Sequence, residues 1–177
     1  MIIINIIVFL TVNIIKVFLF LFQVDLSVDE NTGISKLISW FAVPSSLKAL
    51  IFKPWTIFTY MFLHENFFHI LFNMFVLYFF GTQMEAILNY LAAEDLISFP
   101  VLVYLIIYLV AIVFASSISL ARHKNDVWYR AVGASGAVSA VMFFCIFFEP
   151  WTKLYLYGVL AIPGIIFAVA YLIYSQY

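Results

Sequence analysis

The chain has 177 residues, of which 67% are hydrophobic, 20% aromatic and only 10% charged. This composition, with a mean hydropathy of +1.14, is that of an integral membrane protein. The net charge of -1 leaves no basic surface to neutralise phosphates, which excludes nucleic acid as a partner. We expect one all-α, polytopic membrane domain over residues 1–177, surrounded by the lipid bilayer.

The first predicted span runs from Met1 to about Val24 and is interrupted by Asn5, Asn13 and Lys16. It is longer than a removable signal peptide needs and lacks a small-residue cleavage pattern. The connection from Asp25 to about Leu63 then mixes charged residues with tryptophan and phenylalanine. We expect it to lie in the membrane interface as short amphipathic pieces.

Four more apolar segments are predicted to be membrane helices. A span of the lipid core, about 30 Å thick, needs about 20 helical residues. Three segments reach that length, and the last contains Pro163 and Gly164, which should kink it midway. These three are Phe67–Leu88, Ile97–Leu120 and Leu154–Tyr174, and the fourth segment, Ser135–Phe148, has only fourteen residues.

The short segment is opened by Gly133, Ala134, Ser135 and Gly136. A helix of roughly 21 Å that starts at a serine leaves the hydroxyl below the membrane surface, beside backbone N–H groups without helical partners. A nucleophile with an oxyanion hole needs that arrangement. The alternative is close helix packing, because Gly and Ala repeat here at small-xxx-small spacing.

Histidines mark the start of the second span. His64-Glu65 resembles the start of a zinc-protease H-E-x-x-H motif, but His69 follows His64 at a spacing of five. On a helix that spacing turns the two side chains about 140° apart, so no metal site is expected. His69 and Asn73, four apart, share one helix face and can both donate hydrogen bonds to an oxyanion. Hydrogen bonding between helices is the alternative.

Further along the second span, Gly81 and Glu85 form a G-x-x-x-E pattern. We interpret it as close helix packing followed by a polar contact at the helix end. The single cysteine, Cys145, excludes an internal disulfide and is expected to be a small buried hydrophobe. No cofactor is expected.

In order and spacing, these motifs resemble the rhomboid family of intramembrane serine proteases. The pattern is W-x-x-F-T-x-x-F-x-H-x-x-x-x-H-x-x-x-N, then G-x-x-x-E, then G-A-S-G in a later span. Its residues here are Trp55, Phe58, Thr59, Phe62, His64, His69, Asn73, Gly81, Glu85 and Gly133 to Gly136.

The resemblance implies a role for each matching residue. Ser135 would be the nucleophile that attacks a peptide bond in a transmembrane protein substrate. His69 and Asn73, with the backbone N–H of Ser135 and of its neighbour Ala134, would stabilise the oxyanion. His64 would order the loop entering the second span.

The resemblance also implies a location. The family fold is a bundle of six helices, of which this chain supplies five, in a multi-pass protein of the bacterial inner membrane. The long connection matches the family's membrane-embedded first loop. Bacterial members keep the N-terminus in the cytoplasm, whereas the positive-inside rule applied to this chain's loops gives the opposite orientation; we follow the family.

Three departures from the family pattern stand out. Thr56 follows Trp55 where the family often has arginine, and Ser139 replaces an aromatic residue four positions after the nucleophile. The family's general base is a histidine on a sixth span, but His64, His69 and His123 all precede Ser135. We therefore expect a chain truncated before its last helix and inactive as it stands.

Two other classes of function compete with a protease. A non-catalytic rhomboid-like protein would bind membrane helices without cutting them, and the missing base favours it. A transporter or channel would show paired intramembrane charges or internal repeats, and the sequence has neither. The retained Ser135, His69 and Asn73 favour a protease.

Overall fold

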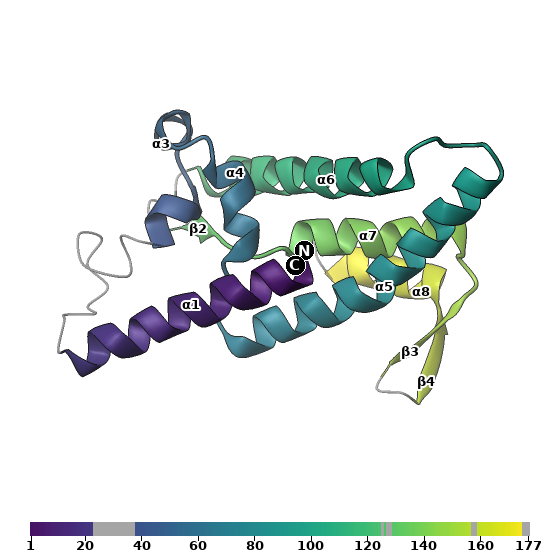
Figure 1. The fold of residues 1–177 in the computed structure, drawn as a ribbon, viewed down its shortest axis with the longest axis horizontal. Helices are drawn as coiled ribbons and strands as arrows, with labels where there is room; N and C mark the ends of the chain where they lie inside the picture. The colour runs from purple at the N-terminus through teal and green to yellow at the C-terminus, as the bar shows by residue number, and fades with distance from the viewer. Residues whose placement is uncertain (23–37, 125, 127–128, 157–158, 175–177) are drawn as a thin grey trace. The chain divides into compact units, whose positions relative to one another are not determined.

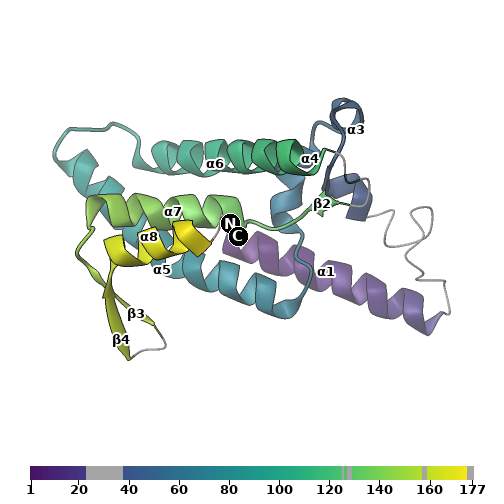
Figure 2. The same cartoon turned by 180° about the vertical axis from the view of Figure 1, so that it is seen from behind.

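The computed structural model describes residues 1–22, 38–124, 126, 129–156 and 159–174. Helices dominate (Figures 1 and 2), and the fold divides into two compact units, Met1–Phe75 with Leu109–Ala137, and Val76–Tyr108 with Val138–Tyr177. The elements are α1 (Ile2–Leu21), β1 (Val43–Pro44), α3 (Leu47–Phe52), α4 (Thr56–Thr59), η1 (Tyr60–Phe62), α5 (Phe67–Ala93), α6 (Pro100–His123), β2 (Arg130–Ala131), α7 (Ser135–Phe148), β3 (Lys153–Leu156), β4 (Leu160–Pro163) and α8 (Gly164–Tyr174).

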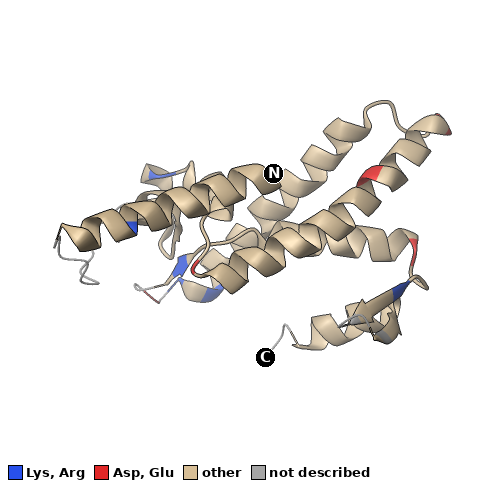
Figure 3. Cartoon of the chain, turned by 60° about the horizontal axis from the view of Figure 1, so that its bottom comes forward, with Lys and Arg blue, Asp and Glu red and all other residues tan. Residues whose placement is uncertain are grey.

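Three helices are long and apolar enough to cross a membrane: α1 with 20 residues, α5 with 27 and α6 with 24. Figure 3 shows them almost free of charged residues along their length. The helix predicted from Ser135 to Phe148 is confirmed with those bounds, and it is too short to span the lipid core alone. The all-α polytopic prediction is therefore confirmed.

The predicted fifth span, Leu154–Tyr174, is wrong in its first half. Residues 153–156 and 160–163 form an antiparallel hairpin with Lys153 opposite Pro163, and α8 contains only the last 11 residues. Figure 1 shows this hairpin, which connects α7 to α8 along the chain, extending away from both helices. Pro163 cannot continue a helix from the preceding residues, because its ring lacks an N–H and disfavours helical geometry in the residue before it. The break therefore falls at the start of α8 and not within a continuous helix.

In the first unit, the connection after α1 pairs through a short β-ladder with the segment before α7. Of the predicted interfacial stretch, residues 25–37 lie outside the described residues, and the remainder forms the predicted short pieces α3, α4 and η1. Val43 pairs with Ala131 and Pro44 with Arg130 between β1 and β2. This pairing holds the connection beside the residues that lead to Ser135.

Trp55 stabilises the same connection locally. Its indole Nε1 donates a 2.8 Å hydrogen bond to the Trp40 carbonyl, and the two rings stack with centroids 5.8 Å apart. The Lys53 ammonium lies 4.9 Å from the centroid of the Trp40 ring, which adds a cation–π contact. Trp55 is therefore a structural residue of this connection.

Tyr60 is the buried residue that joins three segments of the first unit. Its hydroxyl donates a 3.0 Å hydrogen bond to the Ile112 carbonyl on α6, and its own carbonyl accepts a 2.9 Å bond from the Gly133 N–H. Burial, and then the neighbouring Tyr129, raise the pKa of Tyr60 to about 12, so the hydroxyl keeps its proton and remains a donor.

Replacing Tyr60 by phenylalanine should lower the free energy of unfolding by about 1 kcal/mol, because the hydrogen bond to α6 is lost from a buried site. Thermal unfolding in detergent measures this change. Tyr78→Phe is the control, since Tyr78 lies on α5 and is 59% exposed. Equal losses in the two variants would contradict the role of the Tyr60 hydroxyl.

The second unit packs around Met142, Ile146 and Ala168, on α7 and α8. Two polar pairs join its helices: Gln83 donates to the Glu149 carboxylate at 2.8 Å, and the Ser139 and Tyr171 hydroxyls lie 2.9 Å apart. Cys145 is buried, as predicted. These contacts connect α7 and the residue after it with α5 and α8.

Candidate active site

The segment Gly133 to Gly136 forms a tight entry into α7. Gly133 has a φ of +103°, a conformation that side chains with a Cβ rarely adopt. Ala134 is fully buried, and Ser135, which is exposed, is the first residue of the helix. The N–H groups of this first turn lack helical partners and point toward the helix start. Ser135 therefore stands beside backbone donors, as a nucleophile with an oxyanion hole requires.

Gly136 explains how closely α7 approaches α6 at this point. A Cβ built on Gly136 would collide with the Cβ of Ala115 on α6. The expected small-residue packing is therefore present here as well, and it does not compete with the site, because it uses Gly136 while Ser135 stays exposed. The two interpretations of the motif are compatible.

His69 lies directly against this entry. Its Cε1 and Nε2 atoms are each 2.7 Å from the position that a Cβ on Gly133 would occupy. Asn66 caps the start of α5, where its Oδ1 accepts a 2.9 Å hydrogen bond from the His69 N–H. The fold thus brings His69 together with the segment that carries Ser135, although the two are far apart in sequence.

Asn73 lies one turn further along α5 and is buried. Its Nδ2 donates a 2.8 Å hydrogen bond to the His69 carbonyl, so this donor is engaged with the backbone of its own helix. The Nδ2 group carries a second N–H, which this bond leaves available to an oxyanion. Catalytic hydrogen bonds often tighten only in the substrate complex, which leaves Asn73 a candidate.

His64 packs against the ring of His69. The two imidazole rings meet edge to face with centroids 5.0 Å apart, and His64 is only 8% exposed. Burial, followed by the nearby His69, lowers the pKa of His64 to about 4, against a smaller opposing effect of the Phe62 backbone. His64 is therefore a neutral ring at pH 7.

Stability should fall as the pH is lowered from about 6.5 to about 4. His64 has a pKa of 6.5 when unfolded and about 4 when folded, so the unfolded chain takes up the proton first and the folded state loses at most about 3 kcal/mol across this range. Unfolding free energies at pH 7 and pH 5 measure this. His64→Gln should remove most of the slope, and His123→Gln should keep it; a slope unchanged in His64→Gln would contradict the assignment.

Two predicted motif residues are not part of the unit that carries this site. Gly81 and Glu85 belong to the second unit, where Gly81 packs against the Tyr104 hydroxyl on α6, 2.9 Å from the position of a Cβ. This fits the predicted close packing, while Glu85 is exposed. His123 stacks on Tyr129 with ring centroids 3.5 Å apart at the end of α6.

Sequence reasoning missed Tyr60, which holds the Gly133 N–H in place. Its only signal was its position between Thr59 and Phe62 of the recognised pattern. Within the described part of the chain, no group of three or more His, Cys, Asp or Glu residues could hold a metal ion.

A comparison with protein families identifies the family of the chain. The family model described as a Rhomboid domain matches residues 52–176, which covers more than half of the chain and includes all the residues of the candidate site. No curated protein and no solved structure matches the chain significantly. The chain is an integral membrane protein that belongs to the rhomboid family.

Proposed function

We propose that the protein is a serine-type intramembrane endopeptidase that cleaves transmembrane segments of other membrane proteins, with Ser135 as its nucleophile. The observation that carries this proposal is the contact of the His69 ring with Gly133, two residues before Ser135. A hydrogen-bond donor, backbone amides and a serine at the start of a short apolar helix suit acyl transfer below the membrane surface.

In the proposed reaction, the Ser135 oxygen attacks the substrate carbonyl and its proton passes to a general base. The carbonyl oxygen becomes an oxyanion, which accepts hydrogen bonds from the Ser135 and Ala134 N–H groups, His69 and Asn73. Collapse breaks the peptide bond, and the leaving amine takes the proton from the base. Water then hydrolyses the acyl-enzyme, and the reaction needs no cofactor.

The general base is the part of the proposal that these residues do not supply. His64 and His69 lie together at the start of α5, and His123 stacks on Tyr129. Using His69 as a base would remove it from the oxyanion role. A protein of these 177 residues alone is therefore expected not to cleave, and a rhomboid-like protein that binds membrane helices is the second candidate.

The proposal assigns residues 1–177 to one membrane domain and locates it in a bacterial inner membrane. Its test uses the protein expressed from its own gene in its own cells, together with a single-span membrane reporter. Two reporter fragments would support the endopeptidase. An intact reporter that crosslinks to the protein would support the binder and contradict the endopeptidase.

The same assay tests the oxyanion residues. His69→Ala should reduce cleavage by about 10² to 10³-fold, because one oxyanion donor is typically worth that much. Asn73→Ala should act in the same direction, and Thr82→Ala, on an exposed part of α5, should leave cleavage unchanged. Full activity in His69→Ala would remove His69 from the mechanism.

A further inference from the structure

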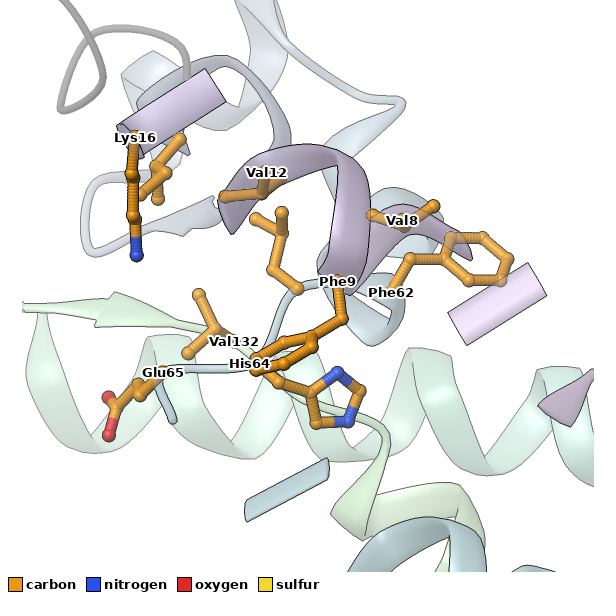
Figure 4. A pocket seen from close by; sticks show the side chains of 10 residues that line it. Val8, Phe9, Val12, Lys16, Phe62, His64, Glu65 and Val132 are labelled. Carbon is orange, nitrogen blue, oxygen red and sulfur yellow. The ribbon is translucent and has the colours of Figure 1, made fainter. Parts of the chain in front are cut away.

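A cavity of about 70 Å³ lies in the first unit, between α1 and the segment from η1 to α5. Figure 4 shows the side chains around it, with Lys16 and Glu65 at the left of the view and the His64 ring near its centre. The rest of the lining is largely apolar and includes Val8 and Val12 of α1. The cavity is thus an apolar space with three polar groups at its boundary.

His64 is unusual among these groups because it is buried without a partner. Only 8% of its surface is exposed, and within the described chain no protein group meets hydrogen-bond geometry with Nδ1 or Nε2. The Phe62 backbone is near enough to affect the pKa of the ring, but it does not meet that geometry. Nearly all buried polar atoms in folded proteins have a protein or water partner. Both nitrogens therefore need a hydrogen-bond partner that the described protein groups do not provide.

The chemistry of the ring restricts that partner. A neutral imidazole has one donor and one acceptor nitrogen, so a matching molecule must both accept and donate a hydrogen bond. Water does both. A site holds a water when it offers about 10–15 Å³ of this measure and two to four polar contacts, and here the volume is several times larger.

We propose that this cavity is a water site, in which ordered water bonds the His64 imidazole and continues toward Lys16 and Glu65, so that α1 is connected to the turn before α5 through water. Lys16 offers donors only and Glu65, when ionised, acceptors only, which gives bridging waters partners of both kinds. Direct apolar packing supplies the remaining contacts between α1 and η1 around the cavity.

Half of the lining of this site lies outside the recognised family region, while His64 lies within it. The family match begins at residue 52, whereas four of the lining residues, Val8, Phe9, Val12 and Lys16, come from α1 and a fifth is Ile38. The water site therefore depends on the packing of α1 against the family domain. It does not depend on the proposed protease activity.

Crystals of the full chain grown in lipid test the proposal directly. The expected result is water density at about 2.7–3.2 Å from a ring nitrogen of His64 in the cavity. Xenon pressurisation of the same crystals should leave that density in place, because dry apolar cavities bind xenon and hydrated ones hold water. Xenon in the wild-type cavity, or no water beside His64, would overturn the proposal.

Two variants strengthen the test. Val12→Phe should fill the cavity and remove the water, whereas Val17→Phe, on an exposed position of α1, should leave it. If Val12→Phe does not fold, His64→Leu serves instead, since it makes the cavity more apolar and should replace the water beside residue 64 by xenon. Water that persists there in His64→Leu would show that His64 does not hold it.

Discussion

Ser135→Ala should reduce cleavage of a membrane reporter by at least about 10³-fold in any form of the protein that cleaves. Without the hydroxyl no acyl-enzyme can form, and the remaining oxyanion groups can only polarise the substrate. Because Ser135 is exposed at the first position of α7, losing its oxygen should leave folding intact. Reporter fragments quantified over time measure the loss, and thermal unfolding confirms the fold.

Ser139→Ala is the matched control for this variant. Ser139 lies one turn further along α7, and its hydroxyl pairs with that of Tyr171 at 2.9 Å. Its removal should cost stability, by about 1 kcal/mol, and leave cleavage of the folded protein within a few-fold of wild type. Retained cleavage in Ser135→Ala, or an equal loss in Ser139→Ala, would remove Ser135 from the role of nucleophile.

Gly133→Ala should disrupt the candidate site and destabilise the fold together. An alanine is strained at a φ of +103°, at a cost of about 1–3 kcal/mol, and its Cβ would lie 2.7 Å from two atoms of the His69 ring. The ring must move away, which displaces the proposed oxyanion donor. We expect a drop of at least about 10-fold in cleavage and a lower unfolding free energy.

Gly81→Ala is the control for Gly133→Ala, because it also replaces a glycine by alanine but does not affect His69. Gly81 lies within α5, and an added Cβ would lie 2.9 Å from the terminal hydroxyl of Tyr104, which a small rotation can move, and 3.7 Å from a methyl group of Leu77, an ordinary contact. Alanine is also the better helix former. A loss in Gly81→Ala as large as that in Gly133→Ala would contradict the argument from the His69 contact.

How far the sequence predicts this fold depends on the kind of pattern involved. The bounds of α7 follow from a sharp change in residue type at both ends of its apolar segment. Gly133 and Gly136 mark its start, and Glu149-Pro150 comes directly after its end. In the span Leu154–Tyr174 the boundary signal, Pro163-Gly164, lies in the middle of the apolar run, and we interpreted it as a kink. Its apolar run suits strand and helix equally, so hydropathy alone could not reveal a hairpin ahead of Pro163.

The candidate site was predictable in its members but not in its contacts. The motif named His69, Asn73 and Ser135, yet nothing in a linear pattern indicates that the His69 ring lies against Gly133, or that the Asn73 amide donates to a backbone carbonyl. Tyr60 was missed because its role depends on its hydroxyl and carbonyl reaching two distant segments. Such contacts follow from the packing of the folded chain.

The most direct test of the central proposal is to locate a covalent adduct. The protein, expressed from its own gene and kept in its native membrane, would be treated with a serine-reactive fluorophosphonate and digested, and its peptides analysed by mass spectrometry. We predict one modified residue, Ser135, and no label in Ser135→Ala. No adduct under conditions where the protein is folded, or an adduct on another serine such as Ser139, would contradict the proposal.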